Sequence, residues 1–142
     1  MKLILRTFAV LCFAGIASAQ TPDISRLAGD WVGAGRFRNV SFQNEFGSVP
    51  FALHIDPDFT LSGKVGNAKI EPCKPKIDGS RIDYYATVQG DIRPENVFRK
   101  NHLVLLIMQV DEHQLVADFH LKSNFLWDWT MRQGVLDARH AQ

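Results

Sequence analysis

The stretch GDWVGAGRFR (residues 29–38) decides how this chain is interpreted. Its side chains alternate in character, as they do along a half-buried β-strand. One face carries Trp31, Gly33, Gly35 and Phe37, and the other carries Val32, Ala34, Arg36 and Arg38. Glycines weaken a flat strand and mark a sharp bend or a close backbone approach. The stretch therefore predicts a strongly curved strand with an aromatic inner face.

The same two-residue period recurs along most of the chain, whereas helical periodicity is scarce. Turn chemistry at Asp56-Pro57-Asp58, Gly66-Asn67, Asp78-Gly79 and Asp111-Glu112 separates the alternating segments. We expect strands at 31–38, 51–55, 59–65, 68–71, 81–88, 102–110, 115–122 and 125–132, and a loop over 90–101. The only helix start that the sequence indicates is Asp23, which would cap a short turn over Ile24 to Ala28.

About seven or eight strands joined mostly by short turns predict an all-β fold. Neighbouring strands connected by hairpins pair antiparallel and favour an up-and-down meander. Closure of that meander into a small barrel removes its exposed edges, so the barrel is the preferred architecture. A β-sandwich is the alternative. The strand from Leu103 to Met108 is apolar on both faces, which indicates either a covered outer face or a subunit contact, including a homodimer.

The first 19 residues have the three parts of a secretory signal peptide. Lys2 and Arg6 precede an apolar run from Phe8 to Ile16, and Ala17-Ser18-Ala19 supplies the small residues of a cleavage site. We therefore expect a secreted or periplasmic protein, with residues 20–142 forming one domain. Cleavage would remove Cys12, leaving Cys73 without an intramolecular disulfide partner.

The charge balance argues against nucleic acid as a partner. The chain has 16 Lys and Arg residues against 15 Asp and Glu, and cleavage would remove two of the basic ones, leaving 14 against 15. Proteins that follow a phosphate backbone usually show a strong basic excess. No apolar stretch after the signal reaches the length of a membrane-spanning helix, about 20 residues, so no integral membrane segment is expected.

Gly29-Asp30-Trp31, placed after a short helical turn and at the start of the first strand, resembles the Gly-x-Trp signature of the lipocalin and calycin barrels. The resemblance implies a calycin-like barrel in which Trp31 packs across the closed end and an arginine near the C-terminus, Arg132 or Arg139, lies over it. It also implies binding of a small molecule. The chain departs from the family in being short, in lacking a long helix before the last strand, and in having no disulfide.

Few residues form a pattern that indicates catalysis or metal binding. Asp118 and His120 share one face of a strand, and Asp128 on the next segment could lie opposite, which would suit a small hydrolase or isomerase if that face were internal. The alternation instead indicates a solvated outer face. The five histidines have no spacing that brings ligands together, so neither a metal nor a cofactor is expected. Cys73, which is close to Lys74 and Lys76, is either an inert, partly buried thiol or an exposed one that is reactive or forms an intermolecular disulfide.

The large aromatic side chains of the predicted inner face provide the main functional hypothesis. They would line an apolar ligand pocket, or they would simply fill the barrel. We interpret the protein as a non-enzymatic barrel that binds a small apolar or amphipathic molecule, with ligand contacts at Trp31, Phe37, Tyr84, Trp127 and Trp129. The alternatives are a protein-interaction module, such as a protease inhibitor or an envelope-associated partner protein, and the small enzyme already described.

Overall fold

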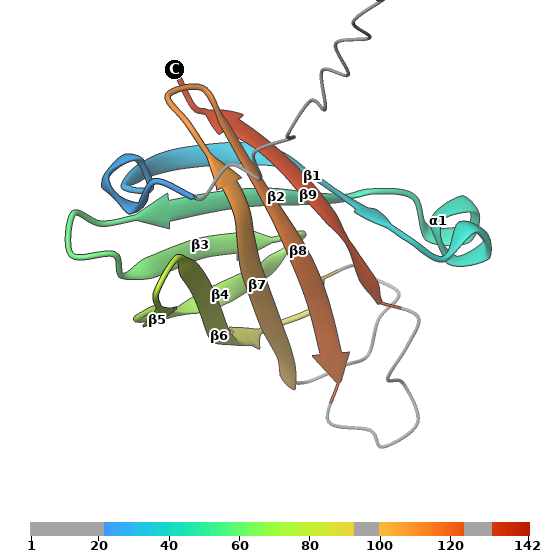
Figure 1. Ribbon diagram of the computed structural model, residues 1–142. Helices are drawn as coiled ribbons and strands as arrows, with labels where there is room; N and C mark the ends of the chain where they lie inside the picture. The colour runs from blue at the N-terminus through green and yellow to red at the C-terminus, as the bar shows by residue number, and fades with distance from the viewer. Residues whose placement is uncertain (1–21, 93–99, 124–131) are drawn as a thin grey trace, which may run out of the picture.

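The protein folds into a closed antiparallel barrel, as seen in a computed structural model that describes residues 22–92, 100–123 and 132–142 (Figure 1). The described strands are β1 (Gly29–Phe37), β2 (Val49–Ile55), β3 (Leu61–Val65), β4 (Ala68–Cys73), β5 (Lys76–Asp78), β6 (Arg81–Gln89), β7 (Lys100–Val110), β8 (Gln114–Ser123) and β9 (Gln133–His140). A 3-10 turn, η1 (Ile24–Arg26), precedes β1, and a short helix, α1 (Val40–Phe46), separates β1 from β2.

Eight of these strands form the barrel in an up-and-down order. Each strand pairs antiparallel with the next one around the sheet, β9 returns to pair with β1, and β4 closes the ring on β6 through Lys69–Gln89 and Ile70–Val88. The short β5 is an additional strand that pairs only with β6 in the described residues. The predicted barrel is confirmed over the alternative sandwich, because the sheet closes on itself and leaves a single continuous wall.

The two ends of the barrel differ (Figure 1). α1 lies at one end, next to the end of β1 at Phe37, and η1 lies at the other, next to the start of β1 at Gly29. The turn between β2 and β3 is at the η1 end, since Gly29 pairs with Ile55. We call the α1 end the mouth and the η1 end the base. Among the described residues, no helix is long and apolar enough to cross a membrane.

The predicted elements are confirmed except at three places. The predicted strand at 125–132 falls largely outside the described residues, and the strand that completes the barrel is β9, whose inward side chains are the small or aliphatic Gly134, Leu136 and Ala138. Strand β9 was not predicted, because its small and aliphatic inward residues give a weaker alternation than aromatic residues do. Helix α1 and strand β5 were not predicted. Both are short, so they lack the several turns or alternations that sequence patterns need.

The described interior is packed with side chains. Trp31, Phe51, Tyr84 and Phe119 are almost fully buried in one hydrophobic cluster that contains every strand except β5. Phe119 lies against Phe51 and Phe37, with ring centroids 5.3 and 5.5 Å apart. A Cβ added at Gly35 would lie 2.6 Å from the Phe51 ring, so this glycine gives the rings their room. The middle of the barrel is therefore a core rather than an open channel.

Candidate functional site

Aromatic side chains converge on a small pocket at the mouth of the barrel. Its volume is about 20 Å³, and it is lined by Phe37, Phe42, Phe46, Val49, Ile92, Leu121 and Arg132. These residues come from β1, α1, the start of β2, the segment after β6, the end of β8, and the residue before β9. That volume is enough for about one water molecule. The pocket is thus an apolar hollow with one cationic side chain.

Helix α1 holds two of these aromatic rings over the opening. Asn39 caps the helix through a 2.9 Å hydrogen bond from the Phe42 amide, and Gly47, with φ of 68°, ends it. The Gln43 side chain ties the helix to the barrel, because it accepts a hydrogen bond from the Phe37 amide at 2.9 Å. Phe42 meets Phe37 edge to face with centroids 4.7 Å apart, and Phe46 lies 4.4 Å from Phe42. The aromatic cluster is therefore continuous from the barrel wall to the helix.

Arg132 is the basic residue in the described lining of this pocket. Its backbone carbonyl accepts a hydrogen bond from the Leu121 amide at 3.0 Å, which fixes the residue beside the end of β8. A guanidinium offers five N–H donors in a planar fork that matches carboxylates and phosphates, and it also stacks on aromatic rings. An apolar lining with one such group suits a molecule that has an apolar body and an anionic or polar head.

Sequence analysis missed Phe42 and Phe46 as lining residues. The signal was present in part, since Asn39 is a good helix cap, the two phenylalanines stand four residues apart, and Gly47 is a helix stop. A seven-residue helix is too short to be stable by itself. Packing of Phe42 on Phe37 and the hydrogen bond from the Phe37 amide to Gln43 add to its stability.

Trp31 belongs to the base of the barrel and is fully buried. Its indole N–H donates a 2.9 Å hydrogen bond to the Leu27 carbonyl, and the His140 ring stacks on it with centroids 3.8 Å apart. Gly29 makes this stack possible, because a Cβ there would lie 2.6 Å from the His140 ring. The tryptophan side chain therefore fills the base of the barrel.

The expectation that Arg132 or Arg139 covers Trp31 is wrong. β9 pairs His140 with Trp31 but pairs Arg139 with Val32, so Arg139 emerges on the outer face and is exposed. Arg132 precedes β9 at the mouth, at the opposite end of the strand. Successive side chains of a strand point to opposite faces, so His140, and not the preceding Arg139, is the residue of β9 that reaches Trp31.

The other predicted ligand contacts lie in different places. Phe37 lines the mouth pocket. Tyr84 is fully buried nearer the base, where its hydroxyl donates a 2.8 Å hydrogen bond to the Phe59 carbonyl and burial raises the pKa of the phenol. Trp127 and Trp129 lie outside the described residues. The structure therefore brings only Phe37 of the predicted set to the mouth pocket among the residues that it describes.

Comparisons with protein-family models, with curated proteins and with solved structures found no match. The closed antiparallel barrel is compatible with a calycin-like fold, and nothing beyond the barrel and the Gly29-x-Trp31 motif supports that assignment.

The candidate catalytic pair faces outward. The Asp118 carboxylate accepts a 2.7 Å hydrogen bond from the Arg38 guanidinium, and both residues lie on the outer face of the barrel. His120 lies two residues further along the same face, and burial, followed by the charge of Lys122, lowers its pKa. Asp128 lies outside the described residues.

Cys73 is half-buried, and burial raises the pKa of its thiol.

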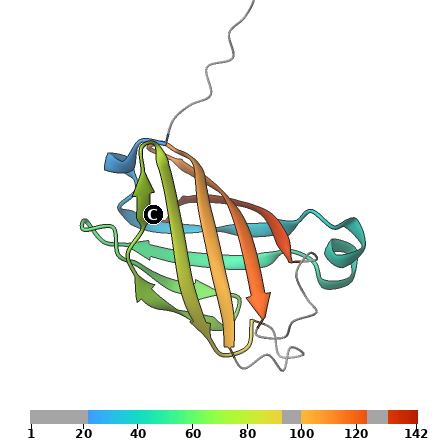
Figure 2. The ribbon, with the colours of Figure 1, turned by 60° about the horizontal axis from the view of Figure 1, so that its bottom comes forward.

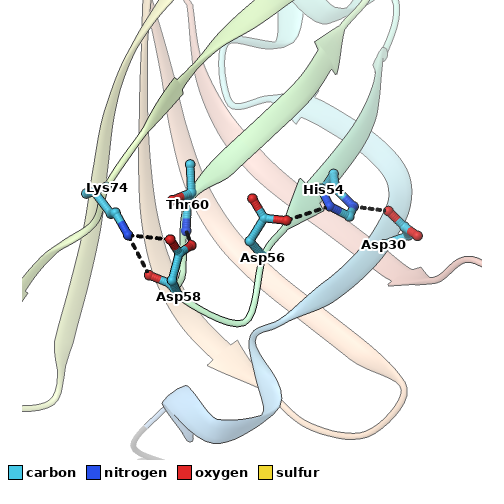
Figure 3. A network of polar contacts seen from close by, with 6 residues as sticks. All are labelled: Asp30, His54, Asp56, Asp58, Thr60 and Lys74. Carbon is cyan, nitrogen blue, oxygen red and sulfur yellow. Dashed lines mark hydrogen bonds and ion pairs between the residues drawn. The ribbon is translucent and has the colours of Figure 1, made fainter.

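No metal centre emerges from the described residues. Within 22–92, 100–123 and 132–142, no group of three or more His, Cys, Asp or Glu side chains is arranged to hold a metal ion. A network of polar contacts lies on the outer surface at the base (Figure 3). There His54 Nδ1 lies 2.6 Å from an oxygen of Asp30, and His54 Nε2 lies 2.9 Å from an oxygen of Asp56.

This network joins the first two strands to the turn that follows them. Neutral imidazole has only one N–H, so His54 can donate to both carboxylates only when it is protonated. The hydrogen bond with Asp30, and then that with Asp56, raises the pKa of His54. Asp58, in the same turn, accepts a 2.7 Å hydrogen bond from Lys74, which follows β4. This contact is the main reason that the Asp58 pKa is lowered to about 2.

The His54 contacts predict a pH dependence of stability. Because the folded-state pKa is raised above the unfolded value, the stabilisation is complete below about pH 6.5 and is lost as pH rises through the folded pKa. We expect the melting temperature of wild type to exceed that of His54→Gln most at mildly acidic pH, with the difference shrinking above neutrality. Thermal unfolding followed by circular dichroism at several pH values measures this. In an Asp30→Asn, Asp56→Asn background, the same substitution should show no such trend, and a persisting trend would locate its cause elsewhere.

Proposed function

We propose that this protein is an exported, non-enzymatic barrel that binds a small amphipathic molecule at its mouth. The apolar part of the ligand would lie against Phe37, Phe42 and Phe46, and its polar or anionic head would contact Arg132. The observation that carries the proposal is the pocket that these three phenylalanines and Arg132 line together. The signal peptide predicted at 1–19 supports placing the protein outside the cytoplasm.

Ligand entry requires the aromatic side chains at the mouth to move, because the hollow of about 20 Å³ holds little more than one water molecule. Helix α1 is the element that we expect to move when a ligand enters. It is a single short helix with no fully buried residue, and Val40 at its start is 71% exposed. Trp127 and Trp129 remain part of the proposal as further contacts, since the segment that carries them connects Leu121 and Arg132, which both line the pocket.

The first test is native mass spectrometry of the mature protein purified from its own host. An adduct of a few hundred daltons would support the proposal and give the mass of the ligand. A clean mass of the single chain, together with no binding of added amphiphiles, would overturn it.

Substitutions at the mouth test the assignment of the site. We expect Phe46→Ala to weaken binding of decanoate about tenfold or more, because burial of a phenylalanine side chain contributes about 1.5–3 kcal/mol. Isothermal titration calorimetry measures the affinity. Val40→Ala is the matched control on the same helix, since its side chain is mostly exposed. Arg132→Gln should weaken binding of decanoate more than binding of decanol, and equal losses for both ligands would exclude a role in head-group recognition.

One observation favours a protein-interaction module as the second candidate. The described core is filled by its own aromatic side chains, so function would then reside on the outer surface. On β7, Leu103, Leu105 and Ile107 face the core, whereas Met108 is 53% exposed on the outside. Tyr85 of β6 is also exposed, and it pairs with Val104, four positions before Met108 on β7. The same native mass spectra distinguish this candidate, because a homodimer through β7 would appear at twice the mass of the chain.

A further inference from the structure

A shallow groove on the outer wall of the barrel collects hydrogen-bond donors from three neighbouring strands. Its volume is about 230 Å³, and it is lined by Tyr85, Ala86, Thr87, His102, Leu103, Val104 and Lys122. The strands involved, β6, β7 and β8, run side by side on the wall that faces the viewer in Figure 2. The groove lies outside the barrel and is separate from the mouth pocket, with which it shares no lining residue.

The strand register explains why these donors meet. Thr87 pairs directly with His102, and His102 pairs directly with Lys122, so the three side chains form one row across the sheet. Directly opposed side chains in antiparallel strands lie about 5 Å apart at Cβ. The adjacent row contains Tyr85 and Val104, which are likewise paired. A hydroxyl, an imidazole and an ammonium group are thus placed beside an exposed phenol ring.

The charges around the groove are uneven. None of the described residues that line it is acidic. The carboxylates at neighbouring positions have donors of their own, since Asp118 binds Arg38 at 2.7 Å and Asp83 binds Arg81 at 2.8 Å. Glu71, on β4, accepts a hydrogen bond from the side-chain amide of Gln89. Lys122 is exposed, and its charge helps to lower the pKa of nearby His120, after the larger effect of burial. Lys122 is therefore the one Lys or Arg side chain among the described residues that line the groove.

We propose that this groove binds the phosphate group of a phosphate ester whose organic part packs on Tyr85. Lys122 would supply the charge, His102 and Thr87 would donate hydrogen bonds to the oxygens, and the Tyr85 ring with Val104 would contact an apolar or aromatic substituent. The ester is either a free small molecule or the head group of a lipid. The groove has room for such a group, because its volume corresponds to several water molecules.

Nuclear magnetic resonance with defined probes tests the proposal. Titration of the mature, isotope-labelled protein with phenyl phosphate should give saturable shifts centred on Thr87, His102 and Lys122. Inorganic phosphate should shift the same signals with lower affinity, because it cannot contact Tyr85. We expect Lys122→Gln to weaken binding about tenfold, the loss typical of a charge-assisted hydrogen bond. Lys64→Gln, on the outer face of β3, is the matched control and should bind like wild type.

Vesicles distinguish the two sources of the phosphate. Co-sedimentation with phosphatidylcholine vesicles that contain phosphatidic acid, lost in Lys122→Gln and absent with phosphatidylcholine alone, would assign the site to a lipid head group. Saturable binding of phenyl phosphate without vesicle binding would assign it to a free ester. The proposal is overturned if neither probe binds, or if Lys122→Gln and Lys64→Gln lose binding equally. These results are independent of the function proposed for the mouth pocket. Binding at the mouth is tested with decanoate, which carries no phosphate, and with substitutions at Phe46 and Arg132.

Discussion

Replacing Trp31 by alanine is expected to lower the free energy of unfolding by about 3–5 kcal/mol. The side chain is fully buried at the base of the barrel, so its removal leaves a cavity. The change also removes the hydrogen bond to the Leu27 carbonyl and the stack with His140. Because a small domain is stable by only about 5–15 kcal/mol, this single change removes a large share of the total. Equilibrium unfolding in urea, followed by circular dichroism, measures it.

Val32→Ala is the matched control for this prediction. Val32 is the next residue on the same strand, but it faces outward and is 53% exposed, so its truncation should cost well under half as much. Trp31→Phe should fall between the two, since it keeps most of the volume and loses the hydrogen bond. A Trp31→Ala protein as stable as the Val32→Ala protein would show that the base of the barrel is not held by this residue.

Gly33→Ala is the second substitution for which we expect a large effect. A Cβ at Gly33 would lie 2.0 Å from the backbone oxygen of Asp137 and 2.5 Å from the Cα of Ala138, both on the neighbouring strand β9. Backbone atoms of a paired strand cannot rotate away as the end of a side chain can. The contact is relieved only by moving β1 away from β9. We expect a loss of about 3 kcal/mol or more, at the upper end of the overpacking range.

Ala34→Ser, at the exposed position that follows Gly33, controls for a change of one heavy atom on the same strand. It should alter the free energy of unfolding by no more than about 0.5 kcal/mol. Differential scanning calorimetry of both variants gives the comparison. If Gly33→Ala melts within a degree or two of Ala34→Ser, the close approach of β1 and β9 is not required by the fold.

Several features of the barrel could be predicted from local pattern alone. The alternation over 51–55 and 59–65, together with the Asp56-Pro57 turn, predicts the β2–β3 hairpin, which is present from Val49 to Val65. The outward orientation of Asp118 and His120 also follows from alternation and is confirmed. These predictions succeed because the side-chain period of a strand is a property of a few consecutive residues. The same period placed Trp31 and Phe37 on the inner face.

The candidate site depends on contacts that no local pattern encodes. Helix α1 packs on the end of β1 through contacts of Phe42 and Gln43 with Phe37, and Arg132 reaches the mouth because it directly precedes β9, which pairs with β1. The donor row of the outer groove depends on the register among three strands, and a shift of one residue would place its side chains inside the barrel.

The sequence by itself therefore determined that this protein is an all-β chain of alternating strands, which face of most strands is internal, and that Trp31 is an inner-face residue. The tertiary structure alone decided that His140 covers Trp31, that the middle of the barrel is filled, and where the mouth and the outer groove lie. The physical reason is the separation along the chain over which each kind of interaction acts. Alternation and turn chemistry act between neighbours in the chain, whereas closure, register and side-chain packing act between residues far apart in it.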